Sequence, residues 1–476
     1  MITLTTLNAR YIHSALGLRY LKANAGELRD SITIVEFIIN TRPIDIAEQL
    51  LAANPTIIGF GIYIWNVEQS EQVIAIIRQV RPTIKIIIGG PEVSFEQTEQ
   101  PICALADYVI CGAADTAFAT LCQALLDDNP PTDKIIQALP TPPIQLRLPY
   151  DLYNDEDIAH RVLYVEASRG CPFKCEFCLS ALDKTATAFD TDRVLQALER
   201  LHQRGVRRFK FVDRTFNLNT ATSLKILRFF LDRMSDGLFV HFEIIPDHLP
   251  ERLRETIKAF PHGSLQFEIG IQSFNTDVQA TISRKQNNEK SVENLTWLRN
   301  ETSAHLHADL IIGLPGEDID RFASSFNRLV ALNPHDIQVG ILKRLRGTPL
   351  IRHTDHYAMR YNPAPPYNIL STSTIDFTTM QRLSRFSRYW DLIMNCNRFN
   401  QTRPLLLGDD PFLTFMKLSD WLFLTTEQTY KISLKRLFGF LYQALTETLD
   451  VTAVEAEQAL RIDYQNSGVK GLPPFP

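Results

Sequence analysis

Apolar segments of strand length alternate with helical patterns through the first 126 residues of the chain. The expected strands cover residues 2–7, 32–37, 57–64, 85–88 and 108–111, and the expected helices cover 14–25, 44–53, 67–80, 95–106 and 116–126. Because each strand is followed by a helix, the pattern predicts an α/β domain, residues 1–126, built on a doubly wound, Rossmann-like parallel sheet. Such sheets bind ligands at the carboxyl ends of their strands.

Residues 127–150 interrupt this alternation. Six prolines fall within the stretch, among them the adjacent pair Pro142 and Pro143. Proline lacks a backbone donor and fixes φ, so a cluster of prolines favours irregular chain. We therefore expect an ordered linker at 127–150.

A second series of strand and helix patterns occupies residues 151–345. The expected strands cover residues 162–167, 209–212, 239–244, 265–271, 305–312 and 337–342, with helical patterns such as 191–204 and 321–331 between them. Six such units in order predict a central partial (β/α)6 TIM-like barrel. The remaining residues, 346–476, carry mostly helical patterns and predict a C-terminal helical domain.

One face of the predicted barrel strands is polar. Successive side chains point to opposite sides of a strand, and Glu243, Glu268 and His307 alternate with apolar neighbours. The apolar set must pack against helices, so the polar set must line the barrel axis, where burial is costly without polar partners. This indicates a lumen that holds a polar ligand. The catalytic residue stays open, with Glu243, His305 and His307 as candidates, and His305, His307 and Asp309 could alternatively bind a metal ion.

A row of basic residues marks the predicted helix at residues 380–394. Its apolar positions share one face, while Arg382, Arg385 and Arg388 lie off that face. Such a row could contact an anionic substrate, although it is more often a solvated helix face.

The composition is that of an ordinary globular protein, with 45% hydrophobic and 22% charged residues. The formal net charge of −5 argues against a broad nucleic-acid-binding surface. The start of the chain lacks a basic segment followed by an apolar core, and no apolar run reaches the length of a membrane span. Seven unevenly spaced cysteines do not suggest a disulfide framework. We therefore expect a cytoplasmic protein without a membrane partner.

Three of the cysteines fall in one short window directly after a predicted strand. Cys171, Cys175 and Cys178 have the spacing CxxxCxxC. Cysteine thiolates are suited to iron–sulfur clusters, and a 4Fe–4S cluster takes four protein ligands when it only stores electrons. Three ligands with no nearby fourth would leave one iron open to a small molecule. A structural zinc site is the alternative, but it usually takes four ligands, and no second pair is present.

This cysteine spacing after a first barrel strand resembles that of the radical S-adenosylmethionine (SAM) superfamily. Three later segments resemble the motifs with which that family holds SAM: Phe211 to Asn217, Glu268 to Ser273, and His307 to Glu317. The resemblance implies a 4Fe–4S cluster on the three cysteines. The residues that it implies for SAM binding are Asp213, Glu268, Gln272, Ser273, Gly313, Pro315 and Gly316.

The N-terminal domain resembles the cobalamin-binding domain that precedes many such barrels. The segments Gly59 to Asn66 and Gly89 to Ser94 follow predicted strands and carry small residues that would let a flat corrin approach the sheet. The residues that the resemblance implies for cobalamin binding are Gly59, Gly61, Tyr63, Trp65, Gly89, Gly90 and Gly112. His13 follows the first strand and is a candidate cobalt ligand, with an ordinary histidine near a helix start as the alternative. The helical C-terminal region resembles an uncharacterised extension found in one branch of these proteins.

Together the resemblances imply a radical SAM enzyme that uses cobalamin to methylate, or to rearrange, an unactivated carbon of a small-molecule or peptide substrate. A flavodoxin or ferredoxin would reduce the cluster. One alternative is a cobalamin-free radical enzyme, such as a methylthiotransferase-like protein with a second cluster at Cys103, Cys111 and Cys122. Another is a non-catalytic cobalamin or redox sensor. The sequence does not reveal the substrate.

Overall fold

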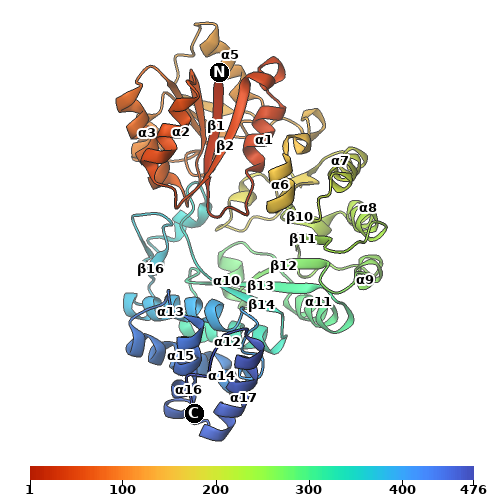
Figure 1. Ribbon diagram of the computed structural model, residues 1–476, viewed down its shortest axis with the longest axis vertical. Coiled ribbons are helices and arrows are strands. Elements are labelled where there is room, and N and C mark those ends of the chain that lie inside the picture. Colours follow the sequence, from red (N-terminus) through yellow and green to blue (C-terminus); the bar gives the residue numbers. More distant parts are fainter.

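A parallel six-stranded sheet forms the first domain in the computed structural model, which describes residues 1–476 (Figure 1). Its strands are β1 (Ile2–Asn8), β2 (Ile32–Ile38), β3 (Ile57–Gly61), β4 (Lys85–Gly89), β5 (Tyr108–Gly112) and β6 (Ile135–Ala138). The strand order β2-β1-β3-β4-β5-β6 reverses between β1 and β3, which makes the sheet doubly wound, as expected. The carboxyl ends of β1 and β3 at this reversal are the usual position of a ligand.

Five helices cover the two faces of this sheet. They are α1 (Leu16–Ala23), α2 (Pro43–Ala52), α3 (Val67–Val80), α4 (Pro101–Leu105) and α5 (Ala117–Leu126). Helix α4 is shorter than the expected 95–106 because Pro101 has no backbone donor and occupies the first helical turn. Two separate apolar cores lie on the two faces, one under α2 and α3 and the other under α1 and α5.

The stretch 127–150, expected as a linker, contains β6. This strand pairs in parallel with β5 and extends the first sheet at its edge. Its four residues, Ile135 to Ala138, are half-buried or exposed, so they lack the continuous apolar pattern of a central strand. The prolines on either side favour irregular chain, so the sequence did not predict this short edge strand.

Six parallel strands in sequential order form the second sheet, the partial (β/α)6 barrel. They are β7 (Leu163–Val165), β10 (Arg208–Phe211), β11 (Phe239–Ile244), β12 (Leu265–Gln272), β13 (His305–Ile312) and β14 (Asp336–Ile341). All six expected strands are present. Burial alternates strictly along β12 and β13, which confirms an apolar outer face and a polar inner face.

Helices connect successive strands along the chain and lie on the outer side of the barrel (Figure 1). The helices of this region are α6 (Asp155–His160), α7 (Thr191–Gln203), α8 (Thr220–Leu231), α9 (Glu251–Lys258), α10 (Thr276–Thr281), α11 (Asn288–Glu301) and α12 (Ile319–Ala331). Asp190, Asn219, Asn287 and Asp318 each accept a hydrogen bond from the first turn of the helix that follows. These N-caps satisfy backbone donors that would otherwise lack partners.

A helical region completes the chain and packs against the β14 side of the barrel (Figure 1). Its helices are α13 (Phe377–Ile393), α14 (Arg403–Leu407), α15 (Pro411–Thr426), α16 (Leu434–Glu447) and α17 (Ala453–Asn466). Two short strand pairs remain: β8 (Ser168–Arg169) with β9 (Thr187–Ala188), and β15 (Arg360–Tyr361) with β16 (Ile369–Ser371). None of the helices has both the length and the apolar character of a transmembrane segment.

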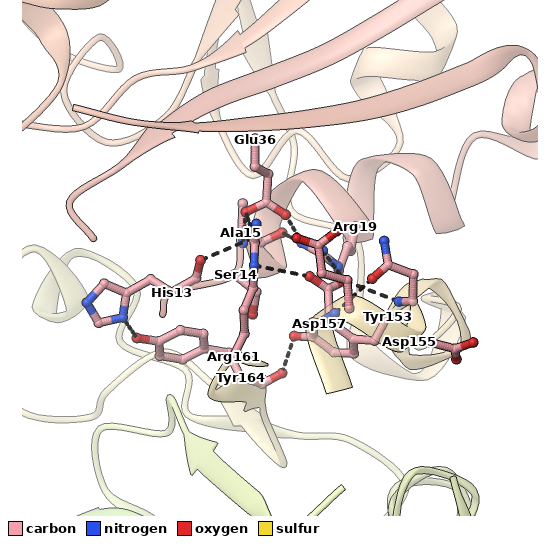
Figure 2. A network of polar contacts seen from close by, with 12 residues as sticks. His13, Ser14, Ala15, Arg19, Glu36, Tyr153, Asp155, Asp157, Arg161 and Tyr164 are labelled. Atoms are coloured by element: carbon pink, nitrogen blue, oxygen red, sulfur yellow. Dashed lines mark hydrogen bonds and ion pairs between the residues drawn. The ribbon is translucent and has the colours of Figure 1, made fainter. Parts of the chain in front are cut away.

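Four buried charges join the first domain to the start of the barrel region (Figure 2). The guanidinium of Arg19 lies 2.5 Å from Glu36 and 2.7 Å from Asp157. Arg161 lies 3.2 Å from the second oxygen of Glu36 and 3.5 Å from Asp157. Each of the four side chains is at most 11% exposed. Since buried charges are costly without partners, this arrangement holds α1 and α6 in one relative position.

Replacing Arg19 tests this junction. Arg19→Ala leaves two buried carboxylates with only Arg161 between them, so we expect a loss of about 3–5 kcal/mol in the free energy of unfolding. Urea denaturation followed by circular dichroism measures the change. Arg42→Ala is the control, because Arg42 pairs with Asp45 at the surface and should matter little. Equal unfolding curves for the two variants would contradict the role of the junction.

Candidate functional site

The cysteine loop lies at the carboxyl end of β7, between the paired strands β8 and β9. Cys171 and Cys175 are buried and Cys178 is half-buried, and all three line one cavity of about 260 Å³. Gly170 has a φ of +84°, and a Cβ there would meet the side chain of Asp183 at 2.8 Å. A glycine is therefore required where the chain turns into the loop.

Glu176 anchors this loop to distant parts of the chain. Its buried carboxylate accepts hydrogen bonds from Ser283 and Arg352, and lies 2.7 Å from Nε2 of His353. Its backbone carbonyl accepts from Leu350 N–H at 3.0 Å. The segment after the barrel thus fixes the loop that carries the cysteines.

Charged side chains from β11, β12 and two loops form the remaining wall of the cysteine cavity. Arg214 donates to both oxygens of Glu243 at 2.7 and 2.9 Å. Glu268 lies 3.2 Å from the amine of Lys210 and 3.1 Å from Nε2 of His241. These two partners outweigh burial and lower the pKa of Glu268 to about 2. Glu268 is therefore a carboxylate at neutral pH and can accept from hydroxyl or ammonium groups.

One oxygen at this cavity lacks a partner in the folded chain. Oε1 of Gln272 is buried without a hydrogen bond, whereas Oδ1 of Asp309 lies 3.4 Å from Nε2 of His307, and both residues line the cavity. Burying such an atom is unfavourable unless another molecule donates to it. Arg284, which donates to Sγ of Cys175 at 3.7 Å, provides a cationic wall beside the thiols. The cavity therefore fits a thiolate-bound cluster together with a polar small molecule.

The candidate catalytic residues occupy different places. Glu243 lines the cysteine cavity, whereas His307 lines a neighbouring cavity. His305 lines neither and pairs with Asp336 at 2.6 Å. His307 lies between Asp309 and Asp336, at 3.4 and 3.6 Å, and these carboxylates raise its pKa to about 10. No group of three histidine, cysteine or carboxylate side chains, the cysteines of the loop included, is arranged at metal-ligand distance, and the alternative of a metal ion at His305, His307 and Asp309 stays a prediction.

Some residues expected to bind SAM do not line the cysteine cavity and are instead hydrogen-bonded within the protein. Asp213 is buried and accepts from the N–H of Ala167 at 2.9 Å and from the hydroxyl of Ser168 at 2.6 Å. Ser273 is buried and donates to Glu317 at 2.8 Å. The structure thus brings Glu268 and Gln272 to the cysteines but places Asp213 and Ser273 behind the wall.

The glycines that follow β13 face the C-terminal region. A Cβ on Gly313 would meet Ile369 at 2.7 Å, and one on Gly316 would meet Tyr357 at 3.2 Å. Both glycines have positive φ, and Pro315 between them is buried. The SAM-binding role of this segment stays a prediction.

A second cavity, of about 240 Å³, lies at the carboxyl ends of β3, β4 and β5. Six of the residues expected to bind cobalamin line it: Gly59, Gly61, Tyr63, Gly89, Gly90 and Gly112. A Cβ on Gly59 would meet Leu4 and Phe118 at 2.8 Å, so this position has room only for glycine. Small residues from the strands and apolar residues from α1 thus form an open slot above the sheet edge. The slot is too small to enclose a large flat ligand, but its small residues suit contact with one part of such a ligand at the strand ends.

Two predicted cobalamin residues lie outside this slot. Trp65 stacks on Tyr63, with ring centroids 4.5 Å apart, and its indole donates to Leu7 O. Nδ1 of His13 lies 2.7 Å from the hydroxyl of Tyr164 on β7 (Figure 2). Burial and the nearby cations Lys210 and Arg10 lower the pKa of His13. Cobalt ligation by His13 stays a prediction.

Arg169 links the two cavities. It lines the slot at the first sheet and lies two residues before Cys171. Its guanidinium contacts Asp115 of the first domain at 2.8 Å and Glu166 at 2.9 Å, and lies over the ring of Tyr20. Neither sequence motifs nor resemblance indicated Arg169 or Arg284, and Arg214 lies within the segment Phe211 to Asn217 but was not singled out there. Each acts through a partner that is distant in sequence, which spacing alone does not reveal.

Comparison with known families assigns both regions. Residues 165–329 match the Radical SAM superfamily, and residues 2–122 match the B12 binding domain. The chain combines a B12-binding domain with a radical SAM domain. Residues 355–475 match DUF4080, a protein family of unknown function, as expected for an uncharacterised extension.

Relatives and a solved structure agree with this assignment. The chain is 25% identical over 388 residues to an uncharacterised methyltransferase, PH0819, from Pyrococcus horikoshii, covering 76% of this chain and 82% of the relative. It is 23% identical to the cobalamin-dependent radical SAM methyltransferase TokK from Streptomyces tokunonensis, covering 66% of this chain but only about half of TokK (51%). The fold resembles the cobalamin-dependent S-adenosylmethionine radical enzyme OxsB, with a TM-score of 0.64 at 14% identity, covering 98% of this chain and 84% of OxsB.

The two domains bear out the expected cofactors. A radical SAM domain implies a 4Fe–4S cluster and SAM, and a B12-binding domain implies cobalamin. A second cluster in the first domain has no support from the structure. Cys103 and Cys111 belong to the apolar core on one face of the sheet, whereas Cys122 belongs to the core on the other face. Burial raises the pKa of Cys103 to about 11 and that of Cys122 to about 12, but it also raises the pKa of Cys171 and Cys175, so the separation across the sheet is what argues against a second cluster.

The pairing of His307 predicts a pH dependence. Because the folded-state pKa of His307 is raised from 6.5 to about 10, its stabilising contribution is complete below pH 6.5 and is lost as the pH rises through about 10. We expect wild type to exceed His307→Gln in thermal midpoint at pH 6.5, and this difference to shrink by pH 10. Differential scanning calorimetry at the two pH values measures it. A difference that is independent of pH would contradict the charged state of His307.

Proposed function

We propose that this chain is a cobalamin-dependent radical SAM methyltransferase that acts on an unactivated carbon of a small organic molecule. The observation that carries the proposal is the pair of cavities at the carboxyl edges of two parallel sheets, with Arg169 reaching from one cavity to the cysteine loop. A flavodoxin or ferredoxin would supply electrons. The methyltransferase names of the two relatives agree with the proposal.

The cysteine loop would hold the cluster. Cys171, Cys175 and Cys178 are the three thiol ligands; burial raises the pKa of the Cys175 thiol, and Arg284 beside it opposes this shift. When bound, the cluster and cobalamin supply radical formation and methyl transfer, which no side chain can perform. Phe173 and Phe177 line the same cavity and reduce the access of water to it.

The charged wall would orient SAM. Glu268 stays ionised between Lys210 and His241 and presents an acceptor to the cavity. The Arg214–Glu243 pair presents both a donor and an acceptor on the same wall. Such fixed, paired charges bind a zwitterionic ligand with little rearrangement. Gln272 supplies its unpartnered oxygen as a further acceptor.

Loss of one cysteine tests the cluster and the reaction together. Cys175→Ala should abolish iron and sulfide binding and all cleavage of SAM to 5′-deoxyadenosine, because two thiolates do not hold the cluster. Anaerobic reconstitution followed by iron and sulfide assays and chromatography of the nucleoside measures both effects. Cys396→Ala is the matched control, since this thiol donates to Ile393 O in the C-terminal region. Cleavage by Cys175→Ala at the wild-type rate would refute the assignment.

A further inference from the structure

A third cavity, of about 770 Å³, opens at the edge strand of the barrel. We name it the seam cavity. Its walls come from β13, β14, the segment after β14, helix α13 and the loop after β1. Phe177 of the cysteine loop lines both the seam cavity and the cysteine cavity, so the two adjoin. A volume of this size lies in the range of small-molecule sites, roughly 300–1,000 Å³.

Unpaired cations lie around the seam cavity. Arg10 and Lys343 are exposed, and neither side chain makes an ion pair or hydrogen bond within the chain. Arg388 of α13 contacts Asp391 at 3.3 Å, and Asp391 is the only carboxylate in the lining. The other two arginines of the row are used structurally: Arg382 pairs with Asp420, and Arg385 lies over Phe423. Arg388 also donates to Thr429 O at 3.3 Å, so the cavity has two cations without partners within the chain, Arg10 and Lys343, beside a third that is paired.

The three cations come from parts of the chain that are far apart in sequence. Arg10 follows β1 of the first domain, Lys343 follows β14, and Arg388 belongs to the C-terminal region. Two of them thus lie at the carboxyl ends of parallel strands, where α/β proteins bind ligands. Several cations that line one cavity raise the local concentration of anions.

The remaining lining is suited to a carbon skeleton with polar groups. Ile311, on the inner face of β13, and Phe177 contribute apolar surface to the lining. Asn368, bridged to Lys343 through its backbone, has a buried Oδ1 without a partner. A buried acceptor without a donor is unfavourable unless a ligand supplies one.

We propose that the seam cavity binds the substrate, a small organic acid or phosphate ester, with its anionic group between Arg10, Lys343 and Arg388. Its carbon skeleton extends past Ile311 to Phe177 and so reaches the cysteine cavity. This proposal rests on the proposed function, which requires a substrate carbon beside the SAM site. It gives the C-terminal region a role, because α13 closes the cavity and contributes one of its cations.

Pyridoxal 5′-phosphate is the probe for this site, because its aldehyde condenses with a lysine amine while its phosphate is drawn to cations. The imine, formed with loss of water, is reduced with borohydride and mapped by mass spectrometry on the reconstituted holoenzyme. We expect Lys343 to be labelled about tenfold faster than Lys417, an exposed lysine of α15 without an ion pair. Pyridoxal, which lacks the phosphate, should label the two lysines at similar rates.

Arg10→Gln supplies the matched variant, because Arg10 has no partner whose loss would disturb folding. It should slow labelling of Lys343 by about fivefold and leave Lys417 unchanged. Citrate and pyrophosphate, compared at equal ionic strength, should protect Lys343, and the better protector distinguishes a carboxylate site from a phosphate site. Equal labelling of Lys343 and Lys417, no effect of Arg10→Gln, or no protection by either anion would overturn the proposal.

The labelling is independent of the proposed reaction. If the reconstituted protein fails to cleave SAM but Lys343 keeps its selective labelling, the methyltransferase assignment fails and the anion site stands. If SAM is cleaved but the labelling is unselective, the reaction stands and the seam cavity is not the anion site.

Discussion

The buried contact of Arg19 and Arg161 with Glu36 and Asp157 fixes how the two parallel sheets face each other. Ion pairs out of water are stable only when every charge keeps its partners, so this junction permits little sliding between the first domain and the barrel. In both sheets a cavity lies at the carboxyl ends of the strands, and a small rotation would separate those ends. The chemistry proposed for the chain depends on their staying close.

A second set of ion pairs supports the same arrangement from the opposite side. Arg346, beyond the barrel, contacts Glu92 at 3.0 Å and also pairs with Glu96, both in the loop after β4. The C-terminal segment that carries Arg346 also reaches Glu176 in the cysteine loop, through Arg352. The segment before the DUF4080 region therefore holds the first domain and the cluster loop, and Tyr367 of that region also donates to Glu92 at 2.7 Å.

The sequence predicted the architecture well because the pattern of buried positions is set locally. The alternation along β12 and β13 is visible in the residues themselves, and so is the CxxxCxxC loop. It missed β6 because this strand is short and lies at the edge of the sheet. Its residues are half-buried or exposed and so carry no pattern typical of a buried strand. It also missed Arg169, and it expected Asp213 in the cavity, where the structure instead uses that carboxylate to hold Ala167 and Ser168. Such roles depend on contacts between distant segments, which periodicity cannot reveal.

Corrinoid content tests the central claim most directly. The protein would be purified and reconstituted without oxygen in the presence of hydroxocobalamin, desalted, and examined by absorption spectroscopy together with iron and sulfide assays. We expect about one corrinoid per chain, held in the slot above β3, β4 and β5. Iron and sulfide in place with no corrinoid retained would contradict it, and would leave a radical SAM enzyme whose first domain serves another purpose.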